Sequence, residues 1–223
     1  MSKLIRTKDY ITFMVLILVL SDLSAAPSTF EDPCPRLQVT KSGIGDYRDK
    51  SRSNLKHLGL VEGAHFTKSV RQLKGGNGGS VAAELNYVLG HFPNHHYALS
   101  LFSQHQLTPG YSNKVPMRPS YFWPQMECYF SRAIALAPND ASVYLIQAIH
   151  LHRKKLLDKA EASYLIAIEL DPTFVEAHYN IGLLYMDKKN FETAKLHAEQ
   201  AYTGGYQLLG LKNRLKKAGY TIN

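Results

Sequence analysis

The feature that most constrains this chain of 223 residues is an internal spacing of 34 in its C-terminal half. Residues 141–172 and 175–206 superimpose at that spacing, so that Ala148 of the first copy falls where Gly182 stands in the second. Each copy contains two segments of helical periodicity joined by a short polar turn. Small residues at matching places let antiparallel helices pack closely, and copies at a fixed spacing stack on one another. The pattern therefore predicts an all-α array of helical hairpins.

The packing positions of the first copy resemble those of the tetratricopeptide repeat (TPR), a 34-residue unit of two helices. The large, small and aromatic residues and the closing proline at the family's offsets are Tyr144, Ala148, Leu151, Ala160, Tyr164, Ala167 and Pro172. The second copy matches less fully, because it has Gly204-Gly205 where the first has its proline. The resemblance implies a TPR-type helical-hairpin solenoid that acts as a binding scaffold and not as an enzyme.

A third, degenerate repeat is predicted over residues 96–138. Pro138 and the packing residues before it stand 34 residues ahead of their equivalents in the first copy, which predicts a helix over 121–137. Residues 108–119 contain three prolines and a glycine, which no helix would hold, so they are read as an insertion in this repeat. About three hairpins are thus expected in a TPR domain over residues 80–223.

Capping helices are predicted on both sides of the hairpins. Residues 81–92 form a helix that begins after Ser80, a residue favoured at the N-cap. Residues 207–218 are apolar on one face only, as the end of a repeat array requires. Residues 27–79 show no sustained period and predict an irregular N-terminal arm. The basic residues of the C-terminal cap are Lys212, Arg214, Lys216 and Lys217.

Three short sequence motifs lie in and just after the arm: DYRD at 46–49, VEGAHFT at 61–67 and FPNHHYAL at 92–99. Together they resemble a leader that precedes the repeats in some exported bacterial TPR proteins. The resemblance implies a periplasmic location and no known reaction.

The N-terminus has the three parts of a secretory signal peptide. A basic start over 1–10 is followed by an apolar run over 11–20 and a small-residue stretch over 21–26. The apolar run is much shorter than the roughly 20 residues that span a bilayer. Residues 1–26 are therefore predicted to be a signal peptide and the protein to be exported, most simply to the periplasm. The alternative is an uncleaved membrane anchor.

Export changes the reading of the two cysteines, Cys34 and Cys128. In an oxidising compartment an even pair is a candidate disulfide. Such a bridge would tie the N-terminal arm to a repeat helix. Two unpaired thiols are the alternative.

The formal net charge of +8 excludes little but favours anionic partners. Removal of residues 1–26 takes away three basic and two acidic residues and leaves +7. The charge is not concentrated enough to indicate nucleic acid, and export argues against that partner. One hypothesis that remains is contact of the basic cap with anionic lipid or glycan of the cell envelope.

No motif indicates catalysis, a cofactor or a metal site. The glycine-rich residues 74–80 lack the Gly-Lys-Ser/Thr ending of a phosphate-binding P-loop. His91, His95, His96 and His105 cluster in sequence, but no cysteine or carboxylate stands beside them at ligand spacing. A structural role is predicted for these histidines, with metal binding as the lesser alternative.

The predicted site is a groove, because the first helix of each hairpin in a TPR array lines a concave surface. The expected peptide-binding residues are Leu145, Ile149, Arg153, Tyr179 and Leu183. Ser142 and Glu176 belong to the same surface, and Ser100 and Gln104 extend it upstream. An apolar strip with polar borders suits an extended peptide or an amphipathic helix of another envelope protein. The alternative is that some of these residues only pack against the capping helix.

Overall fold

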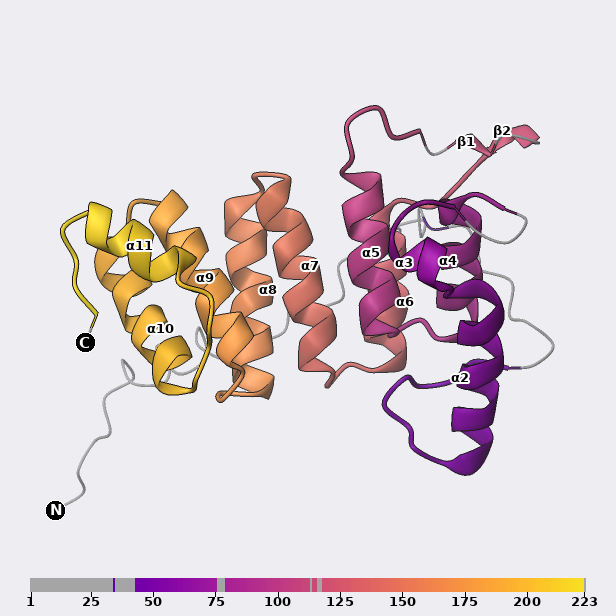
Figure 1. Ribbon diagram of the computed structural model, residues 1–223, viewed down its shortest axis with the longest axis horizontal. Coiled ribbons are helices and arrows are strands. Elements are labelled where there is room, and N and C mark those ends of the chain that lie inside the picture. Colours follow the sequence, from indigo (N-terminus) through magenta and orange to yellow (C-terminus); the bar gives the residue numbers. More distant parts are fainter. Residues whose placement is uncertain (1–33, 35–42, 76–78, 113, 116–117, 223) are drawn as a thin grey trace, which may run out of the picture. The chain divides into compact units, whose positions relative to one another are not determined.

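The computed structural model describes Cys34 and residues 43–75, 79–112, 114–115 and 118–222 (Figure 1). The predicted signal peptide, residues 1–26, lies outside the described residues. Within the described part of the chain, no helix is both long and apolar enough to cross a lipid bilayer.

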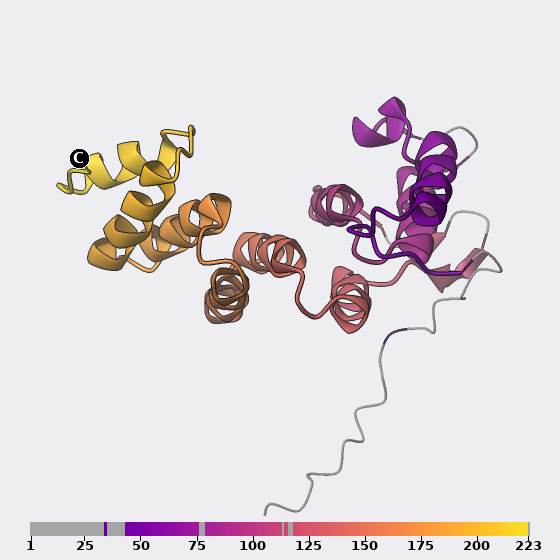
Figure 2. The same ribbon diagram turned by 90° about the horizontal axis from the view of Figure 1, so that it is seen from below.

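Two helical hairpins form the C-terminal half, in agreement with the predicted all-α fold. The first pairs α7 (Ala141–Arg153) with α8 (Leu157–Leu170), and the second pairs α9 (Val175–Asp187) with α10 (Phe191–Thr203). The helices of each hairpin pack side by side, and α8 also packs on α9 (Figure 2). These contacts make the hairpins a solenoid of the TPR type.

The turns inside the two hairpins have the same geometry. Lys155 (φ 63°) and Lys189 (φ 59°) are both left-handed, a conformation that costs a residue other than glycine about 1 kcal/mol. The cost is offset because the next amide then bonds back into the helix: Leu156 N–H donates to a carbonyl of α7 at 3.0 Å. The corresponding amide after Lys189 does the same in α9 at 2.9 Å. The 34-residue spacing thus repeats a backbone conformation as well as a packing pattern.

The upstream hairpin differs from its prediction. It pairs α5 (His96–Gln106) with α6 (Met126–Leu136). The helix expected over 121–137 begins only at Met126, because the insertion is longer than predicted and holds a short antiparallel ladder of β1 (Lys114–Val115) and β2 (Arg118–Phe122). The Gln106 side chain closes the insertion, since its oxygen accepts from Met126 N–H at 3.1 Å and its nitrogen donates to Pro124 O at 2.9 Å.

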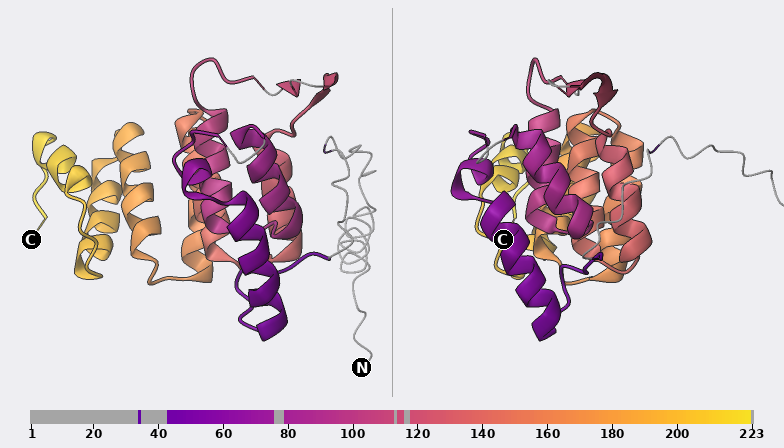
Figure 3. Two further views of the ribbon diagram at one scale, coloured as in Figure 1. Left: turned by 45° about the vertical axis from the view of Figure 1, so that its right-hand side comes forward. Right: turned by 90° about the vertical axis from the view of Figure 1, so that its right-hand side faces the viewer.

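The irregular arm predicted over residues 27–79 is wrong in its second half. Two helices lie there, α2 (Arg52–His65) and the single-turn α3 (Lys68–Arg71). Ser51 and Thr67 cap them by accepting hydrogen bonds from backbone amides. The sequence shows no clear helical period there because α2 buries only Leu58 and Val61. It packs on α4 (Val81–His91), the helix expected before the repeats (Figure 3).

The apolar interior has two clusters that meet at α7. One joins α2, α3, α4, α5 and α6 and receives Val143, whereas the other joins α7, α8, α9, α10 and α11 (Gly210–Lys217) and receives Leu145. Gly182 lies where α11 crosses α9, and a Cβ at that position would stand 2.5 Å from Leu211 Cδ2. The small residue there admits the capping helix, in addition to the close packing of α9 on α10 that the repeat pattern explained.

The predicted disulfide is confirmed. Cys34 bonds to Cys128 of α6, with their Cα atoms 5.2 Å apart although the two residues are 94 positions apart in the sequence. Cys128 is buried, so the bridge joins the N-terminal segment to the upstream hairpin from within.

Replacement of both cysteines by serine is expected to lower the free energy of unfolding by about 4 kcal/mol, because the unfolded chain would regain the entropy of a long open loop. Denaturant titration with and without a reductant measures the change. The double variant serves as the control, since a reductant should not alter it. Equal stability of the oxidised and reduced native protein would contradict this account.

Candidate functional site

A buried carboxylate, Asp140, connects three parts of the chain. It is 3% exposed and caps α7 by accepting from Ser142 N–H at 3.2 Å. Asn94 Nδ2 donates to it at 3.0 Å and His96 Nε2 lies 2.8 Å away. Arg48 Nε stands 3.4 Å from the same carboxylate. Burial alone would raise the pKa of Asp140, but the contacts with His96, Asn94 and Arg48 outweigh it and lower that pKa.

The loop before α2 is fastened to the same place. Asn94 is fully buried, its Nδ2 also donates to Asp46 Oδ1 at 2.7 Å, and its Oδ1 accepts from Tyr47 N–H at 2.9 Å. The ion pair with Arg48 lowers the pKa of Asp46 to about 2, so this carboxylate stays ionised. We call Asp46, Arg48, Asn94, His96 and Asp140 the Asp140 cluster.

His95 makes the second link. It is fully buried, and its Nδ1 accepts from Ala98 N–H at 3.2 Å, which leaves the proton on Nε2. That nitrogen donates to Glu62 Oε1 of α2 at 2.9 Å. Tyr47 stacks on the imidazole with ring centroids 4.2 Å apart. Burial lowers the pKa of His95, so the ring is neutral near pH 7. The three sequence motifs at 46–49, 61–67 and 92–99 therefore meet around the adjacent histidines His95 and His96.

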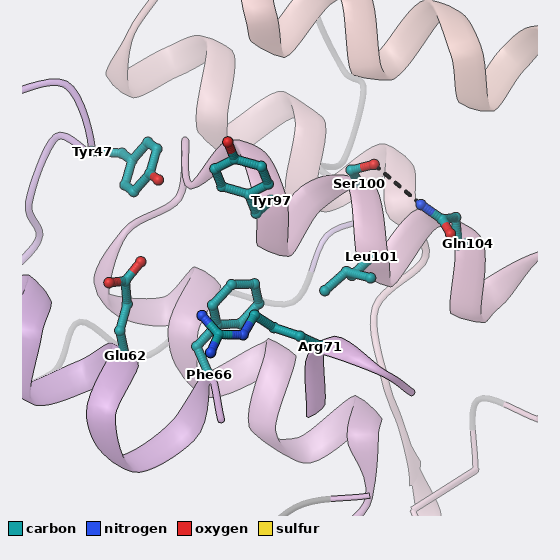
Figure 4. Close-up of a pocket in the computed structure, with 8 residues that line it drawn as sticks. All are labelled: Tyr47, Glu62, Phe66, Arg71, Tyr97, Ser100, Leu101 and Gln104. Atoms are coloured by element: carbon teal, nitrogen blue, oxygen red, sulfur yellow. Dashed lines mark hydrogen bonds between the residues drawn. The ribbon is translucent and has the colours of Figure 1, made fainter. Parts of the chain in front are cut away.

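Two cavities lie on either side of Tyr97 and Ser100 of α5. The first has a volume of about 390 Å³ and the second of about 320 Å³. The residues lining the first are Tyr47, Glu62, Phe66, Arg71, Tyr97, Ser100, Leu101 and Gln104 (Figure 4). The residues lining the second are His96, Tyr97, Ser100, Ser142, Leu145, Ile146, Ile149, Phe174 and Glu176. Because they share two residues, the cavities form one surface, which we call the α5 groove.

The structure separates the five predicted peptide-binding residues. Leu145 and Ile149 line the second cavity. Arg153 is exposed at the end of α7 and lines neither cavity. Tyr179 is 7% exposed and packs against Tyr206, with ring centroids 4.4 Å apart. Leu183 is half-buried against the C-terminal core. Tyr179 thus lies beside the start of the capping helix, since a Cβ at Gly210 would stand 2.7 Å from its hydroxyl.

The upstream extension of the predicted surface lies in the α5 groove. Ser100 lines both cavities, Gln104 lines the first, and Ser142 and Glu176 line the second. Sequence reasoning missed the contribution of Tyr47, Glu62 and Phe66, which come from the segment read as irregular. The one sequence signal that could have identified them is that all three lie in the leader-like motifs.

The C-terminal cap is basic, as predicted, but one of its basic residues, Arg214, is already in an ion pair. Arg214 Nη2 lies 2.7 Å from Asp187 of α9, a carboxylate that also accepts from His152 and Lys155. Burial would raise the pKa of Asp187, yet these three donors lower it to about 2. Lys212, Lys216 and Lys217 are exposed.

The described residues contain no group of three or more His, Cys, Asp and Glu side chains placed to hold a metal ion. Two of the four clustered histidines, His95 and His96, contact the carboxylates of Glu62 and Asp140. His105 lies against Tyr111, with ring centroids 5.1 Å apart. The glycine-rich turn at 74–80 lies partly outside the described residues.

Comparison with known proteins agrees with the geometry of the hairpins. A family model for the TPR repeat matches residues 151–189, which run from the end of α7 through α8 and α9. A search of curated protein sequences found no match. The chain therefore carries a TPR repeat within an all-α solenoid, and TPR repeats generally mediate binding between proteins.

A buried histidine between α5 and α7 predicts acid sensitivity. His150 is 3% exposed, its Nδ1 lies 2.9 Å from Ser103 Oγ, and burial lowers its pKa to about 4. Below pH 6.5 the unfolded chain gains a proton here that the folded protein does not, so stability falls as the pH drops from 6.5 to about 4. His150→Asn keeps a polar atom near the Nδ1 position. Its stability deficit is expected to shrink by about 2 kcal/mol between pH 7 and pH 5. Urea unfolding at both pH values measures this, and an unchanged deficit would contradict the assignment.

Proposed function

We propose that this chain is an exported, non-enzymatic scaffold that binds a peptide or helix of another cell-envelope protein in the α5 groove. The observation that carries the proposal is Tyr97, which is 66% exposed in the wall shared by the two cavities. A large aromatic side chain left in water between two hollows is typical of a binding surface.

The chemistry of the groove suits a polypeptide. Leu145, Ile149 and Phe174 give the second cavity an apolar wall, and Ser142 and Ser100 give it a polar edge. Two hollows of this size along one helix would each take a side chain while polar groups meet the partner backbone. The TPR repeat supports the same class of function.

Two observations support an exported location. The segment at 1–26 has the composition of a signal peptide. The Cys34–Cys128 bridge is of a kind that persists in oxidising compartments and is rare where thiols are kept reduced. We propose the periplasm on these grounds, with the leader-like motifs as a further indication.

A second candidate is contact of the basic cap with anionic lipid or glycan. It is favoured by Leu208 and Leu209, which are 60% and 58% exposed immediately before α11. Two exposed leucines immediately before a helix that carries Lys212 and Lys216 combine the apolar and basic features of a surface that binds anionic membranes. Such binding should weaken steeply with salt, whereas binding in an apolar groove should depend on salt only mildly.

The proposal is tested by selecting peptides from a displayed random library on the oxidised protein and measuring their affinity by calorimetry. Ile149→Gln keeps similar volume but places an amide in the second cavity, so it should weaken binding roughly tenfold. Ile166→Gln is the matched control, because Ile166 is exposed on α8 and lines neither cavity.

Equal losses in both variants, or none in either, would contradict the groove assignment. Failure to select any peptide, together with salt-sensitive binding to anionic vesicles, would favour the basic cap instead.

A further inference from the structure

We propose that the first cavity of the α5 groove recognises a cationic side chain, lysine or arginine. The cation would be bound by the Glu62 carboxylate, the Tyr47 hydroxyl and the ring of Tyr97. This inference rests on the proposed function, since it names the side-chain chemistry that the groove selects in a partner peptide. It concerns the part of the groove built by the N-terminal segment and α5, outside the C-terminal hairpins.

The charge on Glu62 is the first argument. Its one ion-pair partner among the described residues is His95, which is fully buried and whose Nδ1 accepts from Ala98 N–H. The imidazole is therefore a neutral donor, and it orients the Glu62 carboxylate without cancelling its charge. The Glu62 side chain remains 37% exposed, so its second oxygen can meet a ligand. An oriented carboxylate with its charge intact suits a charge-assisted hydrogen bond.

The aromatic residues are the second argument. Figure 4 shows Tyr47, Tyr97 and the Glu62 carboxylate around one end of the cavity. One face of the Tyr47 ring stacks on His95, and Lys50 Nζ lies 5.9 Å from the ring centroid. A ligand cation would therefore meet the Tyr47 hydroxyl, and it would meet the ring of Tyr97, which is largely exposed. Aromatic rings beside a carboxylate favour ammonium and guanidinium groups.

The cavity also holds a positive residue, Arg71, which packs on Phe66 and forms no ion pair with Glu62 among the described residues. The Arg71 guanidinium carbon lies 5.8 Å from the Phe66 ring centroid, in a cation–π contact (Figure 4). The second cavity also carries a carboxylate, Glu176. These local charges oppose the net charge of the chain, which is +8 and would repel a cationic ligand at long range. Selectivity for a cation must therefore come from contacts within the groove.

The test uses Nα-acetyl-L-arginine amide as the probe and the neutral isostere Nα-acetyl-L-citrulline amide as its control. Both are titrated into the oxidised full chain while the ring resonances of Tyr47 and Tyr97 are followed by NMR. The arginine probe should bind with a Kd in the millimolar range and shift both rings, whereas citrulline should not. Equal shifts with both probes, or none at tens of millimolar, would overturn the proposal.

Three variants separate charge recognition from a structural role. Glu62→Gln keeps an oxygen to accept from His95 and should weaken probe binding about tenfold or more. Arg71→Gln removes the cavity's positive charge and should leave binding equal or tighter. Glu199→Gln removes an exposed carboxylate on α10 and should change nothing. Wild-type affinity in Glu62→Gln would also overturn the proposal. Probe binding together with failure to select any peptide would refute the proposed function alone.

Discussion

The buried carboxylate of Asp140 is the interaction on which the arrangement of the other parts depends. Removing a carboxylate from water costs several kcal/mol unless donors surround it. Here the donors are the Ser142 amide of α7, Asn94 and His96 at the start of α5, and Arg48 of the N-terminal loop. Each comes from a different part of the chain. The charge can therefore be buried only when the loop, the upstream hairpin and the first complete repeat are in place together.

The groove follows from that constraint. Asn94 holds the loop that carries Tyr47, while the adjacent His95 holds Glu62 of α2. Both groups are thereby placed along α5, where Tyr97 and Ser100 form the wall between the two cavities. The segment before the repeats thus supplies half of the residues that line the first cavity: Tyr47, Glu62, Phe66 and Arg71. A TPR array without it would keep the α5 wall of the first cavity but lack the opposite wall and its carboxylate.

The hairpins could be predicted from the sequence because Ala148, Gly182 and their neighbours recur at a fixed spacing. The helix α2 could not, because it contains Gly59 and Gly63 and buries little apolar surface, so neither propensity nor period revealed it. For the site, register identified Leu145 and Ile149 but could not show that the loop before α11 covers Tyr179. Contacts such as Asp46 to Asn94 join residues 48 positions apart, which no local pattern encodes.

The most direct test of the central claim is amide hydrogen exchange in Asp140→Ala, followed by mass spectrometry. If Asp140 joins the N-terminal segment to the repeats, exchange should accelerate in α2 as well as in α7, although Asp140 lies outside α2. Asp187→Ala is the matched control, because it removes another carboxylate with several donors but should affect only the C-terminal helices. Faster exchange confined to α7 would contradict the account.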